Sequence, residues 1–274
     1  MSSTLWGRRY YSAPIDYLNS IYIREYDIRK ADISIFLSKG VISQQDYDFY
    51  ARIPNTARNI NMGLLQQSNP TLKDILAKGI EEARHNFFEY NNIQDHEVLS
   101  IQNDAIWLIN KIPTTTSFGV VNFIPKSVYT SYYRLPKKFN KEFFYYLDKV
   151  HGEEYLTIKG MGNIAQAMHR QYMTDFLLTL FNSIELYPIE DAINLIQVFY
   201  DRYIKKELDI NYYRKYGGLG EFVSNLRSPV MQDRYNFMGM DQKHIDMIDI
   251  SYNAFMLIEF YKIVSSIYFN SRKK

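Results

Sequence analysis

Residues 98–109 read VLSIQNDAIWLI, two apolar runs separated by Gln102, Asn103 and Asp104. Each run has the length of a buried strand, and the polar triplet between them is typical of a hairpin tip. Short strand-like segments with turn signals between them follow at residues 118–124, 128–135, 142–147 and 155–159. The sequence therefore predicts an antiparallel sheet that contains the hairpin of residues 98–109.

Helical patterns lie on both sides of these strands. Residues 71–90 carry an apolar stripe at helical spacing, formed by Leu72, Ile75, Leu76, Ile80, Ala83, Phe87 and Phe88. Upstream, residues 21–26 alternate as a half-buried strand that ends at Asp27, and a helix is expected to begin within residues 28–37. Ser43 is a candidate N-cap of the next helix, and Pro54 separates that short helix from another. From residue 164 onward the pattern is helical, over 164–184, 189–208 and 243–270.

These patterns predict an α+β fold, an antiparallel sheet with helices on one face, followed by an all-α C-terminal domain. We expect an N-terminal arm at residues 1–19, an α+β domain at 20–160 and a helical domain at 161–274.

Composition excludes several classes of protein. The 274 residues include 32 Lys and Arg against 30 Asp and Glu, a net charge of +2, so a nucleic-acid site must be a local basic face. Apolar residues make up 46%, which excludes a disordered chain. The absence of cysteine excludes disulfides, thiolate catalysis and Cys-ligated metal sites, and favours a reducing cytoplasm. No apolar stretch reaches about 18 residues, so we expect neither secretion nor a membrane span.

Aromatic residues are abundant, with 25 Tyr and 17 Phe. They gather in the segments SVYTSYYR, residues 127–134, and KEFFYYL, residues 141–147, beside basic residues such as Arg134. Such rings either pack within the sheet or stack on bases of a nucleic acid. The five histidines have no metal-ligand spacing, and no P-loop, GxGxxG or GxSxG motif is present.

An acid at a hairpin tip can meet an acid at the end of a neighbouring strand, and Asp104 and Asp27 are such a pair. Two adjacent carboxylates repel each other unless a cation lies between them. Mg²⁺ is the natural cation, because proteins hold it with one or two carboxylates plus substrate phosphates. Arg58 and Asn61, three residues apart on one helix face, could then serve a triphosphate site.

Three segments, in this order, resemble the palm motifs A, B and C of template-dependent DNA polymerases. Residues 26–35, YDIRKADISI, resemble motif A of family B enzymes, Y-D-hydrophobic-x-S-hydrophobic-Y-P-S-I. Residues 57–63, ARNINMG, resemble the family A form of motif B, A-K-x-I-N-F-G, with Arg58 in place of Lys. Residues 100–106, SIQNDAI, resemble motif C, Y-hydrophobic-D-T-D-S-hydrophobic, with only its second acid, Asp104.

After motif C the resemblance continues in FGVVNF, residues 118–123, and in YLTIKGMG, residues 155–162, which has the Lys-Gly pair of family B. It covers roughly residues 20–165. The departures are Gln102 for the first acid of motif C, Asp32 at the aromatic sugar gate, and Leu65 and Gln66 for the Tyr-Gly pair of motif B. Only 26 residues precede Asp27, so we expect no proofreading exonuclease.

The resemblance implies a palm-like domain at 20–160, a thumb-like helical domain at 161–274 and a role for each candidate residue. Asp27 and Asp104 would be catalytic and bind Mg²⁺. Arg58, Arg29 and Lys30 would neutralise the triphosphate, and Asn61 would face the nascent base pair. Contacts to a primer–template would come from Lys159, Arg134, Lys205 and Arg214, the last two in the Tyr- and Lys-rich segment 201–218. A protein partner could supply missing fingers or an exonuclease.

Two alternatives stay open. The chain could be a non-catalytic viral replication or virion protein that keeps a palm-like shape and uses its aromatic surface for protein contacts, or the motif order could be coincidental. In either case Asp27 is a strand-end cap, Asp104 a turn acid, Arg58 part of a solvated helix face and Lys159 a loop residue.

Overall fold

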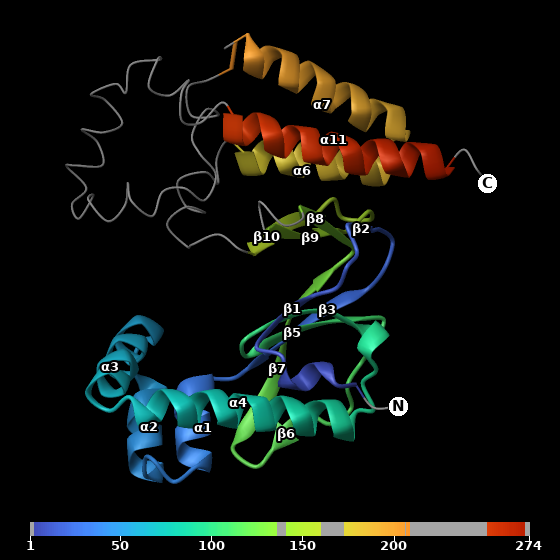
Figure 1. The fold of residues 1–274 in the computed structure, drawn as a ribbon. Coiled ribbons are helices and arrows are strands. Elements are labelled where there is room, and N and C mark those ends of the chain that lie inside the picture. The colour runs from blue at the N-terminus through green and yellow to red at the C-terminus, as the bar shows by residue number, and fades with distance from the viewer. Residues whose placement is uncertain (1–2, 136–140, 160–172, 206, 209–250, 272–274) are drawn as a thin grey trace, which may run out of the picture. The chain divides into compact units, whose positions relative to one another are not determined.

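The computed structural model describes residues 3–135, 141–159, 173–205, 207–208 and 251–271, and Figure 1 shows their helices and strands. The chain forms two compact units. The first consists of Ile21–Tyr129 and the described part of Met1–Ile15, and the second of Asp16–Ser20 and the described part of Thr130–Lys274. Each unit combines an antiparallel sheet with helices. The predicted α+β fold class is therefore confirmed.

The first unit is built on a six-stranded antiparallel sheet with the order β1-β4-β5-β3-β7-β6. β3 lies at its centre, paired with β5 on one side and β7 on the other. β4 and β5 form the predicted hairpin, whose turn is Asn103 and Asp104. The strands are β1 (Tyr10–Ser12), β3 (Ile23–Ile28), β4 (Val98–Gln102), β5 (Ala105–Ile109), β6 (Ser117–Phe118) and β7 (Val121–Tyr129).

Four α-helices separate β3 from the hairpin. They are α1 (Ala31–Ser38), α2 (Gln44–Arg52), α3 (Asn55–Ser68) and α4 (Thr71–Tyr90), and 3-10 helices lie at η1 (Leu5–Gly7) and η2 (Asp95–Glu97). The predicted cap of α2 is present, because Ser43 and Asp46 form a reciprocal capping box. Pro54 precedes α3 as expected, and α4 has the bounds that its apolar stripe predicts.

The core of the first unit lies between α4 and one face of the sheet (Figure 1). Tyr26 and Ile28 of β3 face this core, where Phe87 of α4 stacks on Phe123 of β7 with ring centroids 4.2 Å apart. Because strand side chains alternate, Glu25 and Asp27 point to the opposite face. Helix packing on one face thus leaves two acids of the central strand together on the other.

The second unit has a four-stranded antiparallel sheet, order β10-β9-β8-β2, with α6 packed beside β10, α11 beside β8, and α7 against both helices. Its core is aromatic, and Tyr133 stacks on Phe181 with centroids 4.1 Å apart. The elements are β2 (Tyr17–Leu18), β8 (Ser131–Leu135), β9 (Lys141–Leu147), β10 (Glu154–Lys159), α6 (Met173–Leu186), α7 (Ile189–Ile204) and α11 (Ser251–Ser271).

Burial decides the role of most aromatic side chains in the two Tyr- and Phe-rich segments. The rings that are fully buried are those of Tyr132, Tyr133, Phe143, Phe144 and Tyr145. These rings pack in the interior and cannot stack on bases of a nucleic acid. Tyr146 stacks instead on Tyr155, which is partly exposed.

The division between the units differs from the predicted boundary near residue 160. β9 pairs with β8 and with β10, and β8 also pairs with β2, so these strands form a separate sheet instead of extending the first one. Residues 1–19 differ from an extended arm as well, because β1 pairs with β4 and β2 pairs with β8. Segments 160–172 and 209–250, with the Tyr- and Gly-rich turn, lie outside the described residues.

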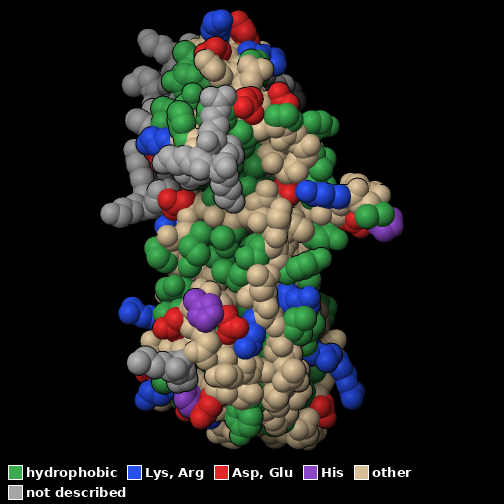
Figure 2. Space-filling view, turned by 90° about the vertical axis from the view of Figure 1, so that its right-hand side faces the viewer, with side chains coloured by type: hydrophobic (Ala, Val, Ile, Leu, Met, Phe, Trp, Pro, Cys, Tyr) green, Lys and Arg blue, Asp and Glu red, His purple; other side chains and the backbone are tan. Residues whose placement is uncertain are grey.

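Surface charge is mixed on the face drawn in Figure 2, where Lys and Arg are interspersed with Asp and Glu among the described residues. This agrees with the net charge of +2 and leaves room only for local basic sites. Within the part of the chain that the structure describes, no helix has both the length and the apolar character needed to cross a membrane.

Candidate functional site

Two carboxyl groups meet where the central strand of the first unit passes the tip of the β4–β5 hairpin. Asp27 lies opposite Ala105 in the register between β3 and β5. Asp104 precedes Ala105 in the turn, and the backbone N–H of Ile28 donates to its carbonyl oxygen at 3.3 Å. A side-chain hydrogen bond joins the two carboxyl groups. The structure therefore brings together the two acids that the sequence analysis paired.

Burial and, after it, the neighbouring charge of Asp27 raise the pKa of Asp104 from an ordinary 3.8 to about 6. Asp104 therefore holds a proton at pH values where an exposed aspartate is ionised, and this proton bridges to Asp27. A cation between the two groups would remove the repulsion that favours the proton.

The acid pair suits the way in which proteins hold Mg²⁺, with one or two carboxylates and with water or substrate phosphates in the other positions. Among the described residues no group of three or more His, Cys, Asp or Glu side chains is arranged as a metal site. Any cation at Asp27 and Asp104 would thus take the rest of its ligands from water or phosphate.

The hairpin tip is held from α4 and from the N-terminal segment. Asn103 has a φ of 59°, a left-handed conformation that asparagine tolerates, and its N–H donates to the carbonyl of Arg9 at 2.8 Å. Arg84 of α4 is buried, donates to the carbonyl of Asn103, and donates through Nε to the carbonyl of Trp6 at 2.8 Å. The position of Asp104 therefore depends on a buried guanidinium.

A third acid and a lysine extend the site along β3 and β7. The Lys126 ammonium lies 3.3 Å from Oδ2 of Asp27 and 3.6 Å from Oε1 of Glu25. The Glu25 side chain is only 2% exposed, and the Tyr129 hydroxyl donates to its Oε2 at 2.7 Å. Burial lowers the pKa of Lys126, but the charges of Glu25 and Asp27 outweigh this effect and leave the pKa above its ordinary value.

Sequence reasoning did not select Glu25, Lys126 or Tyr129. A signal for Glu25 was present, because it stands two residues before Asp27 on an alternating strand and must share its face. Lys126 and Tyr129 carry no comparable local signal, since their approach to Glu25 depends on the pairing between β3 and β7.

Two predicted triphosphate-binding cations, Arg29 and Lys30, follow β3 directly, and the third, Arg58 of α3, lies near Lys30. The charges of Arg29 and Arg58 act on Lys30, whose pKa is lowered first by burial and then by these two neighbours. The Lys30 ammonium donates to the carbonyl of Ala51 at 2.6 Å, while Arg29 is exposed. Arg29 is thus the member of this group with the most open side chain.

Arg58 is not part of a solvated helix face. Its side chain is only 8% exposed, donates to Asn55 at 2.9 Å and lies 3.6 Å from Oδ1 of Asp32. Asp32 occupies the position of the sugar gate in the motif A comparison. The residue at that position therefore forms an ion pair with the arginine of the motif B segment. Asn61, one turn further along α3, is exposed.

The predicted nucleic-acid contacts belong to the second unit. Arg134 of β8 forms an ion pair with Asp16 at 3.0 Å, and Lys159 ends β10 opposite Glu142. Lys205 follows the last turn of α7 and is exposed. Arg214 lies outside the described residues. Their contacts with nucleic acid stay a prediction.

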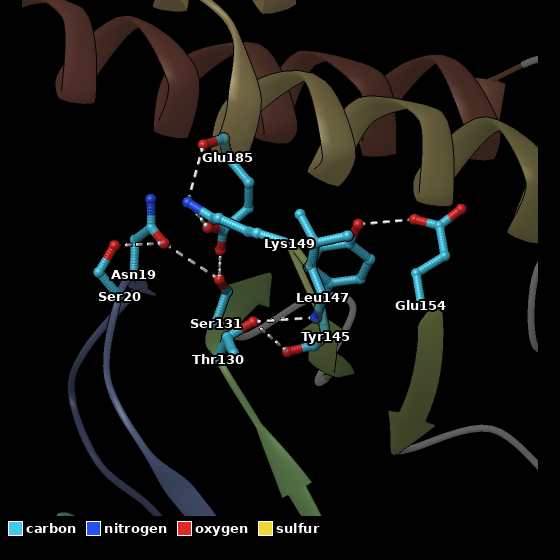
Figure 3. Close-up of polar contacts among 9 residues, drawn as sticks. All are labelled: Asn19, Ser20, Thr130, Ser131, Tyr145, Leu147, Lys149, Glu154 and Glu185. Carbon is cyan, nitrogen blue, oxygen red and sulfur yellow. Dashed lines mark hydrogen bonds and ion pairs between the residues drawn. The ribbon is translucent and has the colours of Figure 1, made fainter. Parts of the chain in front are cut away.

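The second unit has a buried charge of its own (Figure 3). The Glu185 side chain of α6 is 1% exposed, accepts a hydrogen bond from Ser131 of β8, and lies 3.6 Å from the Lys149 ammonium. Asn19 accepts a second contact from Ser131 at 3.3 Å. Burial raises the pKa of Glu185, although Lys149 acts in the opposite direction. This cluster joins α6 to the sheet.

Comparison with known proteins identifies one family. A family model described as "Bacteriophage PBS1 gene 130 protein" matches residues 1–266. No curated protein matches the chain.

Proposed function

The chain belongs to the bacteriophage PBS1 gene 130 protein family, and we propose that its first unit is a palm-like module for template-directed nucleotidyl transfer. The contact between Asp27 and Asp104 carries this proposal. An acid of the central strand and an acid of the hairpin turn share a half-buried position, exposed Arg29 follows two residues after Asp27, and the two acids keep the order of motifs A and C. A carboxyl group whose pKa is raised by burial and by a neighbouring acid, as that of Asp104 is, is also typical of functional sites.

In this proposal each side chain has a defined task. Asp27 and Asp104 hold Mg²⁺, which when bound stabilises the charge that develops on the transferred phosphoryl group. Arg29, with Lys30 and Arg58 behind it, neutralises the triphosphate, and Asn61 faces the nascent pair. The 3′ hydroxyl of the primer attacks the α-phosphorus, and pyrophosphate leaves. The second unit contributes backbone contacts through Lys159, Arg134, Lys205 and Arg214. We further propose that the protein acts in the cytoplasm of the host cell.

Primer extension tests the proposal. Purified protein is incubated with a primed template, Mg²⁺ or Mn²⁺, and either dNTPs or rNTPs, beside Asp27→Asn and Asp104→Asn. Extension by the wild type and its loss in both variants would support a polymerase. Asp74→Asn is the matched control, because Asp74 is an exposed acid in the first turn of α4, and it should extend as the wild type does. Extension that survives in both site variants contradicts the assignment.

The ion pair between Lys126 and Asp27 favours a second candidate function. The Lys126 ammonium already neutralises Asp27, so this acid needs no bound cation. Such an arrangement suits a non-catalytic replication or virion protein with a palm-like shape. Absence of extension and of nucleic-acid binding by folded wild-type protein would favour this candidate.

A further inference from the structure

The β3–β7 pairing contains an irregularity at Lys126, next to the acids of β3. Glu25 lies opposite Ser127 and Tyr26 lies opposite Pro125, so β7 has one extra residue, Lys126, at this point. Such a β-bulge re-aims side chains and changes which face the following residues occupy.

The effect of the bulge is visible on either side of it. Phe123, before the bulge, packs into the core beneath α4. Tyr129, after it, bonds to Glu25 on the opposite face. With regular alternation these two side chains would share one face, because they are separated by an even number of residues. The bulge is therefore what brings Tyr129 onto the face of the acids, whereas Lys126, two residues after the partner of Asp27, lies on that face in either case.

Lys126 has one fixed partner and one exchangeable partner. Glu25 is buried and is held by Tyr129 at 2.7 Å, so it stays in place as an anchor. Asp27 is 24% exposed and is also in contact with Asp104. The Lys126 side chain itself is 52% exposed, so it can move away from Asp27 and remain beside Glu25.

We propose that Lys126 is an internal counter-ion that competes with a divalent cation for Asp27 and so sets the cation affinity of the site. Without a bound cation, the ammonium neutralises Glu25 and Asp27 together. When a divalent cation occupies Asp27 and Asp104, Lys126 retreats to Glu25 alone. The inference rests on the proposed cation site at these two acids and adds the residue that regulates it.

Mn²⁺ binding, followed by its electron paramagnetic resonance signal and by calorimetry at constant pH, tests this competition. Lys126→Met removes the competing charge, and we expect Mn²⁺ to bind roughly tenfold more tightly than to the wild type, the size of effect expected for one unit charge near a divalent ion at a partly exposed site. Lys126→Arg keeps the charge and should bind as the wild type does. The gain should vanish in the double variant Lys126→Met, Asp27→Asn.

Lys111→Met is the matched control, because Lys111 also forms an ion pair, 3.3 Å from Glu97, in the same unit. It changes the net charge equally and should leave Mn²⁺ affinity unchanged. Lys126→Gln provides a second neutral variant in case Lys126→Met does not fold, and its expected effect is the same. Equal gains in the variants at positions 111 and 126 would overturn the inference, because they would show a general charge effect.

A measurement on the wild type needs no folded variant. Mg²⁺ should increase the rate at which an acylating reagent modifies Lys126, read by mass spectrometry, while the rate at Lys111 stays constant. If the wild type binds Mn²⁺ through Asp27 but neutral variants at position 126 bind no more tightly, the role of Lys126 is wrong and the cation site stands. If neither the wild type nor these variants bind Mn²⁺, the inference and the proposed cation site fall together.

Discussion

The carboxyl groups of Asp27 and Asp104 share a hydrogen bond at the point where β3 passes the hairpin tip. Such a contact opposes folding whenever both groups are ionised, because the like charges repel in a half-buried position. The fold nevertheless holds the hairpin tip to β3 through the Ile28 N–H and to α4 through Arg84. This arrangement makes the pair sensitive both to protons and to cations.

Asp104→Asn should stabilise the protein at pH 7.5 and have little effect near pH 4.5. The folded pKa of Asp104, about 6, lies above its ordinary value of 3.8. The folded state therefore binds the proton more tightly, and the associated stability is present below pH 4 and is lost as the pH rises through 6. We expect a melting temperature about 2–4 °C higher at pH 7.5, the shift that ~1 kcal/mol produces in a chain of this size.

Thermal melts at pH 4.5, 6 and 7.5 without divalent cations would measure this effect. Asp74→Asn serves as the exposed control and should show no such pH dependence. An Asp104→Asn gain that is the same at all three pH values would contradict a raised pKa.

Arg84→Met should destabilise the first unit by about 2–4 kcal/mol. The substitution removes two charge-assisted hydrogen bonds and leaves the carbonyls of Asn103 and Trp6 without this donor in a buried setting. Urea unfolding measures the loss, and Arg84→Lys should recover only part of it because a single ammonium cannot reproduce the fork geometry. A change below about 0.5 kcal/mol, the usual range for surface substitutions, would show that Arg84 does not anchor the hairpin.

The sequence predicts local features of this fold well. The helix at 71–90, the Ser43 cap and the hairpin at 98–109 each depend on residues a few positions apart, and all three are present. The meeting of Asp27 and Asp104 could also be predicted, because it requires only that the hairpin lies beside the strand that precedes it.

Features that depend on distant pairing could not be predicted in this way. The strands at 131–159 have the same alternation as those of the first sheet, and only their pairing with β2 shows that they form another one. The approach of Tyr129 to Glu25 depends on a one-residue bulge that leaves no mark in the local pattern. The burial of Arg58 against Asp32 has no local signal either, because this contact joins two helices, and it excludes the alternative in which Arg58 lies on a solvated helix face.

Lys149→Met should destabilise the second unit at neutral pH by about 1 kcal/mol, a modest value because the Lys149 side chain is half exposed. The substitution removes the cation that faces buried Glu185, so the pKa of Glu185, already raised by burial, should rise further. Since the folded pKa lies above the unfolded one, the loss is largest at pH 7.5 and shrinks as Glu185 takes up its proton toward pH 4.5.

Denaturant unfolding at these two pH values tests this difference. Lys39→Met is the matched control, because Lys39 pairs with an exposed acid, Glu82, and its effect should be small at both. Lys149→Arg should retain most of the stability. A loss that does not depend on pH would mean that Lys149 acts through packing of its aliphatic chain alone.

Two glycines in helix interiors should respond to alanine in opposite directions. A Cβ at Gly79 of α4 would lie 2.2 Å from Cγ2 of Ile35 on α1, whereas a Cβ at Gly63 of α3 would meet no atom within 4 Å. Alanine raises helix propensity by up to about 1 kcal/mol at either site. At Gly63 this gain should appear as increased stability.

At Gly79 the clash should outweigh the gain in propensity, with a net loss of about 1–3 kcal/mol from overpacking. α1 would have to move away from α4, and with it the segment that follows Asp27 and carries Arg29 and Lys30. Chemical unfolding measures both variants. If Gly79→Ala is as stable as Gly63→Ala, the close approach of α1 to α4 is not required, and the position of these two cations relative to Asp27 must be fixed by β3 alone.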